Sequence, residues 1–413
     1  MSGAAARPTR PAPAHEPPPR RTPALWALLT AALLAAFNLR TAVTSVGPLL
    51  DELQGDLALS STVAGVLTTL PVISFALLGA LVPRLAHAMG EQRLLAVGLG
   101  LMAGGLALRA LVTSGVLFLL LSVVALVGGA MGNVLLPGLV KRHFASRVGP
   151  VTAAYTTSMA IGAAVAAAAT VPLAAIGGQV DWRVGLGAWA VPAAVAAAVW
   201  LVLPGDGKTA ASDTERPVLR LRGSSTAWAV ALFFGVQAMQ AYIAFGWFAL
   251  YFREQAGVSA ARAGFLLAVL ASLSIPMSAL MPWLAGRLTS QRPLVLAVAA
   301  LYLVAYTGMA LAPGAAAVLW AVLVGAGAGA FPLALTLIGL RARSADGTRA
   351  LSAFAQSVGY SVAAAGPLLV GVLNDATGGW GWSFGLLYLA VAVMTIAGWL
   401  AGSPRFVEDD VVA

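Results

Sequence analysis

Arg40 is the strongest candidate for a functional residue, because of its charge and its position in the sequence. It lies in the run Phe37-Asn38-Leu39-Arg40-Thr41, inside the first long apolar segment, residues 24–50. If that segment is helical, Arg40 lies roughly 24 Å from its start. An arginine in hydrocarbon costs at least about 2.5 kcal/mol, so it usually faces an interior cavity and marks the path of a ligand. With no acidic residue beside it, Arg40 favours an anionic or electron-rich ligand; the alternative is a structural pin that caps carbonyls or reaches outward.

Further polar side chains are expected at mid-membrane depth in the first, fifth, seventh and eleventh apolar segments. Their amide and hydroxyl groups can orient a polar ligand without adding charge, and the alternative is hydrogen bonding between helices, worth roughly 0.6 kcal/mol each. Asn38 and Arg40 are separated by about 200° on a helix, so one of them is expected to serve a neighbouring helix. The complete predicted ligand-binding set is Asn38, Arg40, Thr44, Tyr155, Ser158, Gln237, Gln240, Tyr242, Gln356 and Tyr360.

Four other residues are predicted to have gating or structural roles: Asn133, Arg109, Arg84 and Arg93. Asn133 lies near the end of the fourth segment. Arg109 lies near the end of the third, where we expect it to anchor the helix by reaching to the membrane interface. The alternative for Arg109 is an electrostatic funnel for incoming anions.

The elements that must position these residues follow from composition. Of 413 residues, 60% are hydrophobic and only 9% are charged, whereas soluble domains carry about 25% charged residues. The chain is therefore predicted to be an integral membrane protein with the lipid bilayer as its partner. Its basic excess lies in short loops, which orients helices and does not indicate nucleic acid. There is no cysteine, and the three histidines lie in the tail or in loops, so no metal and no cofactor are expected.

Twelve apolar stretches, each of about 19 residues or more, are long enough to span a bilayer as helices. They are residues 24–50, 60–82, 94–112, 115–140, 148–174, 184–203, 226–252, 263–285, 294–312, 315–340, 350–373 and 381–401. The predicted organisation is a disordered tail (1–23), a six-helix half (24–203), a linker (204–225), a second six-helix half (226–401) and a C-terminal tail (402–413).

Loop charges predict the orientation in the membrane. If both termini are cytoplasmic, nearly all loop Lys and Arg residues lie on the cytoplasmic side, and the outer side holds Arg109, Arg183, Arg253 and Arg262. This asymmetry favours an even number of spans with both ends in the cytoplasm of the cell (inner) membrane.

The two halves also repeat in sequence. Leu81–Ala86 matches Leu280–Ala285 around a shared proline, and Gln92-Arg93 matches Gln291-Arg292 in the same register. The repeat indicates a duplicated six-helix unit with a central cleft between the two copies.

Three blocks in order resemble the major facilitator superfamily and, within it, the cyanate/2-nitroimidazole transporter-like family. They are Asn38-Leu39-Arg40 followed by Gly47-Pro48-Leu49-Leu50, then Gly132–Pro137 with Val140-Lys141-Arg142, then Leu351–Phe354 with Gln356–Tyr360 and Gly366–Leu369. The resemblance implies an all-α fold of twelve transmembrane helices in two six-helix halves related by pseudo-two-fold symmetry. It also implies that helices 1, 4, 7 and 10 line the cavity. In the loop between helices 2 and 3, Gly90 and Arg93 fit the superfamily pattern but its acidic residue is missing.

Together these observations predict a secondary transporter, not an enzyme, which moves a small anionic or polar solute by alternating access with Arg40 as the main contact. A drug or toxicant exporter of the same fold is the alternative. A monomer is expected. The acidic residues all lie away from the middle of the apolar segments, so any coupling is expected to run through the charge of the solute.

Overall fold

The computed structural model describes residues 22–144, 147–203 and 221–411. Most of the predicted N-terminal tail and of the predicted linker lies outside these ranges. Within them the chain forms helices and contains no strand.

The N-terminal half has six spans, of which the first and sixth are broken into shorter helices. In chain order its elements are α1 Thr22–Asn38, α2 Thr41–Thr44, the 3-10 helix η1 Gly47–Leu49, α3 Leu50–Leu57, α4 Ser61–Met89, α5 Glu91–Arg109, α6 Gly115–His143, α7 Val148–Ala174, α8 Trp182–Gly187 and α9 Ala190–Val202.

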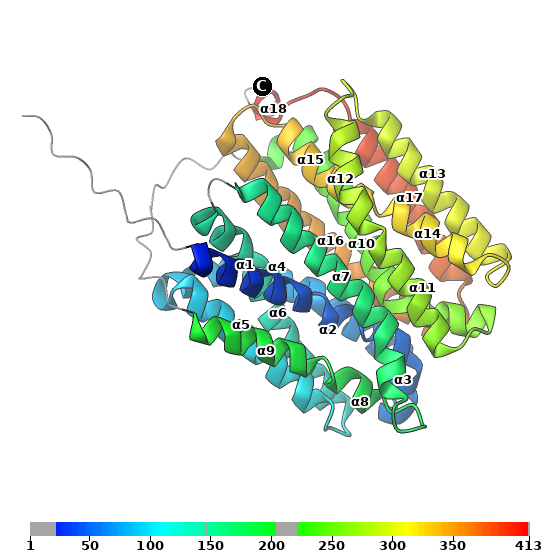
Figure 1. The fold of residues 1–413 in the computed structure, drawn as a ribbon. Helices are drawn as coiled ribbons and strands as arrows, with labels where there is room; N and C mark the ends of the chain where they lie inside the picture. The colour runs from blue at the N-terminus through cyan, green and yellow to red at the C-terminus, as the bar shows by residue number, and fades with distance from the viewer. Residues whose placement is uncertain (1–21, 145–146, 204–220, 412–413) are drawn as a thin grey trace, which may run out of the picture.

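The C-terminal half also has six spans, of which the second and fourth are split, and it ends in a short extra helix. Its elements are η3 Leu221–Gly223, α10 Ser225–Ala256, α11 Ala260–Ser272, α12 Ser274–Ala285, α13 Arg292–Leu311, α14 Ala317–Gly327, α15 Ala330–Leu340, α16 Ala345–Thr377, α17 Gly381–Ala401 and α18 Val407–Val411. Among the described residues, 10 helical segments are long and apolar enough to cross a membrane, and α4 and α5 complete the predicted set of twelve. The two halves lie side by side in Figure 1, coloured blue to green and yellow-green to red.

The first span is not the continuous helix that its hydropathy predicts. α1 ends at Asn38, and Arg40 occupies the N-cap position of α2 with φ −109° and ψ −12°. The freed carbonyl of Arg40 accepts hydrogen bonds from the backbone N–H of Thr44 at 3.0 Å and from its hydroxyl at 3.1 Å. Pro48, which has no N–H to donate, lies in the 3-10 turn that follows. These breaks direct Arg40 away from the regular face of α1.

The eighth span, α11 with α12, is interrupted in a related way. The hydroxyls of Ser272 and Ser274 donate to the carbonyls of Val269 and Ala271, at 2.8 and 2.7 Å. Such bonds compete with the regular helix ladder and bend helices. The sixth and tenth spans are also split, between α8 and α9 and between α14 and α15, so the single helices predicted for these spans are each two helices.

The predicted repeat has a counterpart in matching side-chain contacts. In the N-terminal half, Trp182 Nε1 donates to Asp56 Oδ2 at 2.9 Å; in the C-terminal half, Trp380 Nε1 donates to Glu254 Oε2 at 2.7 Å. Each pair joins the start of the last span of a half to the end of its first span. The two halves therefore use the same contact at equivalent places.

The bundle has two ends, which are opposite in Figure 1. We name them the α3 end, where α3, the start of α4 and the end of α16 lie, and the α18 end, where α18 and the start of α10 lie. At the α3 end the halves pack backbone against backbone. A Cβ on Gly65 would lie 2.9 Å from the Pro367 carbonyl oxygen, and one on Gly264 would lie 2.5 Å from that of Ala167.

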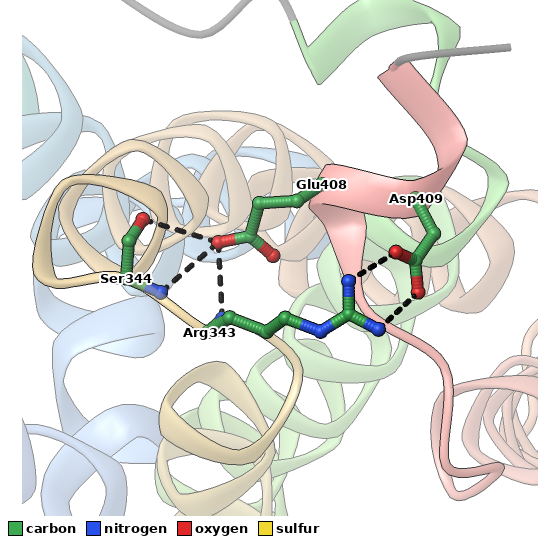
Figure 2. A network of polar contacts seen from close by, with 4 residues as sticks. All are labelled: Arg343, Ser344, Glu408 and Asp409. Carbon is green, nitrogen blue, oxygen red and sulfur yellow. Dashed lines mark hydrogen bonds and ion pairs between the residues drawn. The ribbon is translucent and has the colours of Figure 1, made fainter.

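The C-terminal tail folds back onto its own half through the acidic side chains of α18. Glu408 Oε1 accepts from the backbone N–H groups of Arg343 and Ser344 at 3.0 and 3.1 Å, beside the start of α16, and Asp409 pairs with the Arg343 guanidinium (Figure 2). Asp410 Oδ2 accepts from the Thr226 N–H at 2.9 Å at the start of α10. The carboxylates of Glu408 and Asp410 thus complete the N-terminal hydrogen bonding of two spans.

Candidate solute-binding site

The guanidinium of Arg40 lies where the two halves meet. Arg40 Nη1 donates a hydrogen bond to Tyr242 Oη at 3.2 Å, which joins the break in the first span to α10 of the other half. The Arg40 side chain also lies over the ring of Phe75, with its guanidinium carbon 5.9 Å from the ring centroid. Arg40 remains partly exposed, and in the described structure it makes no ion pair. Its positive charge is therefore held by a phenol and an aromatic face.

Aromatic rings form the wall around this charge. Tyr360 of α16 packs between Phe75 of α4, with ring centroids 6.4 Å apart, and Phe234 of α10, at 5.3 Å. We define the Arg40 site as Arg40, Phe75, Tyr242 and Tyr360. It combines one cation with two phenolic hydroxyls, which suits a small ligand with a negative or electron-rich group and an apolar body.

The other predicted residues of the first span and its neighbour face their own half. Asn38 is buried, and its amide donates to the carbonyls of Leu34 and Pro192 at 2.8 and 3.2 Å. Ser158 Oγ donates to the Leu33 carbonyl at 2.8 Å and joins α7 to α1. Thr44 is buried against the Arg40 carbonyl. These contacts set the position of the helix break that carries Arg40.

The two glutamines of α10 do not lie with Tyr242. Gln240 Oε1 accepts a hydrogen bond from Tyr306 Oη at 3.0 Å, and its Nε2 contacts Met394 Sδ at 3.3 Å, so Gln240 lies among α10, α13 and α17. Gln237 Nε2 donates to the Phe234 carbonyl of its own helix at 3.0 Å. Both glutamines are 1% exposed, which favours a role in packing the C-terminal half.

Of the remaining predicted residues, Gln356, Tyr155 and Asn133 are half-buried. Gln356 donates to Ser352 Oγ at 2.8 Å, one turn away on α16. Tyr155 packs at the edge of the apolar core of the N-terminal half. Asn133 donates to the Gly129 carbonyl of α6 at 3.1 Å. Arg93 is exposed, and the side chain of Arg84 lies outside the described residues.

Arg109 does not reach the membrane interface, and the expectation of a snorkelling anchor is wrong. Its side chain is 1% exposed, and it lies over the ring of Phe118 with 5.6 Å between guanidinium carbon and ring centroid. Two features account for this. A side chain points back along its helix toward the N-terminus, which directs Arg109 away from the end of α5, and the side of α5 that carries Arg109 packs against Phe118 and Ser122 of α6.

A polar gate closes the α3 end beyond the Arg40 site. Arg253 of α10 pairs with Glu52 at 2.7 Å and Asp51 at 2.8 Å, both on α3. Asp375 of α16 accepts from the backbone N–H groups of Ser61 and Thr62, at 2.9 and 2.6 Å, at the start of α4. We call these contacts the α3-end gate. They join the two halves on the side of Arg40 that faces the α3 end.

Sequence reasoning missed two parts of this arrangement. Phe75 was overlooked because an aromatic residue in an apolar helix gives no signal until its neighbours are known. Glu91 was overlooked as a partner. It pairs with Arg142 at 3.1 Å and so joins the start of α5 to the end of α6. Glu91 lies next to Gln92-Arg93, close to the loop position at which the superfamily pattern expects an acidic residue and this chain has none. That proximity was the available signal.

A sequence model of the Major Facilitator Superfamily matches residues 28–364, most of the chain and all of the Arg40 site. The chain belongs to the major facilitator superfamily. Among curated relatives, an uncharacterized transporter, YycB of Bacillus subtilis (strain 168), is 37% identical over 398 residues, covering 94% of this chain and 96% of the relative. This superfamily member is a multi-pass membrane transporter of small molecules.

Two further relatives confirm the predicted resemblance within the superfamily. The 2-nitroimidazole transporter of Escherichia coli (strain K12) is 37% identical, covering 92% of this chain and 96% of the relative. The cyanate transport protein CynX of the same organism is 30% identical, covering 89% and 96%. A bacterial homologue of the lysosomal transporter Spinster, solved in an inward-facing and occupied conformation, superposes with a TM-score of 0.76 at 18% identity over 95% of this chain and 99% of its own. That likeness confirms the twelve-helix fold.

Proposed function

We propose that this transporter moves a small anionic or polar solute across the cell membrane by alternating access, and that Arg40 is its main contact. The observation that carries the proposal is the Arg40 guanidinium, which lies between the halves with no carboxylate partner among the described residues. A guanidinium offers five donors in a planar fork that matches carboxylate-like and nitro groups. Tyr242 accepts a hydrogen bond from one of these donors, and the others have no hydrogen-bond partner among the described residues, so they would be available to a solute.

The relatives support the size and character of this solute. One relative is a cyanate transport protein and another a 2-nitroimidazole transporter; both solutes are compact, and each carries negative charge density, on the cyanate ion or on the nitro oxygens. The Arg40 site has the matching chemistry, since the cation would bind the electron-rich group and the rings of Phe75 and Tyr360 would contact the remainder. A site of this kind disfavours lipophilic cations, which would meet the positive charge.

We further propose that the α18 end faces the cytoplasm, so that both termini are cytoplasmic, as the loop charges predict. The polar α3-end gate would then seal the outer side. A solute would reach Arg40 from the cytoplasmic side in this state, and release to the outside would require Arg253 to leave Asp51 and Glu52. Rocking of one half against the other would exchange the two states.

The test is ligand-induced thermal stabilisation of the purified protein with cyanate, nitrate, small carboxylates and nitroaromatics, followed by uptake into proteoliposomes. We expect one of these classes to stabilise the wild type and Arg40→Ala to weaken its apparent affinity about tenfold or more, the cost of a charge-assisted contact. Arg40→Lys keeps the charge but not the planar fork, so we expect an intermediate loss.

The matched controls are Arg262→Ala and Arg262→Lys. Arg262 is an exposed arginine over the ring of Phe265, far along the chain from the site, and its loss should leave the affinity unchanged. Equal affinity of the wild type and both Arg40 variants for a transported solute would remove Arg40 from the site. Raised cellular tolerance to lipophilic cations, without a response to any anion, would instead support the exporter alternative.

A further inference from the structure

Arg109 is a buried charge whose hydrogen-bonding capacity is mostly unused. Its Nη1 contacts Ser122 Oγ at a long 3.4 Å, while Nε and Nη2 have no partner although both are buried. These two nitrogens share one edge of the guanidinium plane, the edge that binds an anion with two parallel donors. Within the described ranges, Arg109 makes no ion pair. A buried cation without such compensation is strongly destabilising.

Arg109 lines a small cavity between the two halves. The cavity has a volume of about 20 Å³, and its polar lining comes from Arg109, Ser122, Thr68 and Tyr242. A space of this size accommodates one small species, since a water needs roughly 10–15 Å³. The same Tyr242 accepts the hydrogen bond from Arg40, so the cavity begins on the far side of the Arg40–Tyr242 contact, toward the α3 end.

We propose that this cavity is a second anion site, which binds one monovalent anion of halide size on Arg109. Nε–H and Nη2–H of Arg109 would donate to the anion, and the Ser122 hydroxyl would turn from accepting to donating. The cavity is too small for a carboxylate with a side chain or for a nitroaromatic, so its occupant differs from the larger solutes considered for the Arg40 site. The proposal rests on the burial of Arg109 and does not depend on which solute is transported.

Because the cavity lies between the two halves, an anion bound in it would affect how the halves are held together. Thr68 and Ser122 belong to the N-terminal half, whereas Tyr242, Phe245 and Gly246 belong to the C-terminal half. The cavity therefore exists only while the halves are in contact on this side. An anion bound there would stabilise the state in which the α3 end is closed, because a ligand shifts an equilibrium toward the state that binds it.

The test uses the purified full-length protein at constant ionic strength, with chloride or bromide replacing gluconate, which is too large for the cavity. We expect a saturable rise in the midpoint of thermal unfolding of the wild type. For Arg109→Gln, which removes the buried charge, the apparent anion affinity should fall about tenfold or more. In gluconate alone this variant should unfold at a higher temperature than the wild type, because the uncompensated charge is gone.

Three controls separate the possible outcomes. Arg262→Gln removes an exposed arginine and should respond to chloride as the wild type does. Arg40→Gln should also keep the response; a response lost in Arg40→Gln and kept in Arg109→Gln would assign the anion to the Arg40 site and overturn the proposal. Ala42→Val adds two methyl groups to the cavity wall without changing charge, and should abolish the response.

A direct measurement does not depend on the variants folding. A crystal structure of the wild type in bromide should show an anomalous peak beside Nε and Nη2 of Arg109. A site filled by water alone in bromide, or an equal chloride response in the wild type and in Arg109→Gln, would show that the charge is hydrated and that no anion site exists.

Discussion

Three buried or half-buried arginines in this protein show how partners decide the role of a charge. Arg341 is satisfied internally: its side chain donates to the carbonyls of Ala401 and Gly402 and to Gln291. Arg40 has a single phenolic partner and an aromatic face, and Arg109 leaves one whole edge free. Arg341 therefore fixes the structure, whereas Arg40 and Arg109 have donors to spare for a ligand.

The carboxylate of Asp410 is a second case in which partners define a residue. Burial raises the pKa of Asp410. Hydrogen bonds lower it more, so that the net pKa is below its usual value; the donors are the Thr226 N–H and the hydroxyls of Ser224, Thr226 and Ser225. The pKa of Glu408 is lowered in the same way: burial raises it, and hydrogen bonds led by backbone N–H groups, among them those of Arg343 and Ser344, outweigh burial. A carboxyl group with a depressed pKa stabilises the folded state only when it is ionised.

This gives a pH prediction for Asp410→Asn. The wild type should be more stable than the variant by about 1 kcal/mol at neutral pH, the usual contribution of a side chain at a helix N-terminus. The difference should persist at any pH above about 4, the ordinary pKa of an aspartate, and fade as the pH falls through the lower pKa of the folded protein. The measurement is the midpoint of thermal unfolding of both proteins from pH 7 downward.

The control for this prediction is Asp409→Asn. Asp409 pairs with Arg343, but both side chains are about half exposed, so the loss at neutral pH should be smaller than for Asp410→Asn. A difference between the wild type and Asp410→Asn that stays constant at every pH would mean that ionisation of Asp410 does not carry the stabilisation.

At the scale of helices, the position of Arg40 depends on how closely α1 approaches α7. A Cβ at Gly162 of α7 would overlap the backbone carbonyl of Phe37, three residues before Arg40. Ser158 of α7 bonds the Leu33 carbonyl on the same helix face, one turn earlier. The end of α1, and with it the break that presents Arg40, is held by this backbone contact.

We therefore expect Gly162→Ala to displace α1. Overpacking of this kind costs roughly 1–3 kcal/mol, and the shifted Arg40 should also bind the transported solute more weakly. The measurement compares thermal stability and solute affinity with those of Gly100→Ala on α5, where an added Cβ meets nothing within 4 Å. Gly100→Ala should match or exceed the wild type in stability, because alanine favours the helix. A Gly162→Ala protein as stable as Gly100→Ala would show that α1 and α7 adjust without strain.

At the scale of the whole molecule, the proposed alternating access implies an equilibrium between a closed and an open α3 end. The closed α3 end has a polar part, the α3-end gate, and an apolar part, the backbone contact of α4 with α16 and of α7 with α11. The carboxylate of Asp51 is well exposed, so the gate holds by several modest contacts and not by one strong ion pair.

We expect Arg253→Gln to shift this equilibrium toward opening of the α3 end. Losing both ion pairs should cost the closed state roughly 1 kcal/mol, which changes the population about fivefold. The measurement is the rate at which a thiol reagent modifies Thr68→Cys, a cavity-lining position that is buried while the α3 end is closed. The chain has no native cysteine, so the introduced thiol is the single target.

The control is Arg183→Gln in the same Thr68→Cys background. Arg183 pairs with Asp56 at 2.7 Å within the N-terminal half and does not cross to the other half. Its loss should leave the modification rate of Thr68→Cys unchanged. If Arg253→Gln also left that rate unchanged, the α3-end gate would not control closure.

The sequence alone determined the class of the protein, the number of spans and the two-half repeat, and it singled out Arg40 as a charge inside an apolar segment. These follow from local composition: the bilayer demands long apolar helices, and a charge within one of them is conspicuous wherever it points. The helix breaks were less accessible, because hydropathy averages over a window and does not register a two-residue interruption such as Leu39-Arg40.

Only the tertiary structure decided which polar side chains meet between the halves. Gln240 and Tyr242 are two positions apart on α10, yet Gln240 lies among helices of its own half and Tyr242 contacts Arg40. Arg109 is near the end of its helix in sequence and buried in space. The physical reason is that the environment of a side chain depends on the rotation of its helix and on what packs against it, and neither is encoded in the residues of that helix alone.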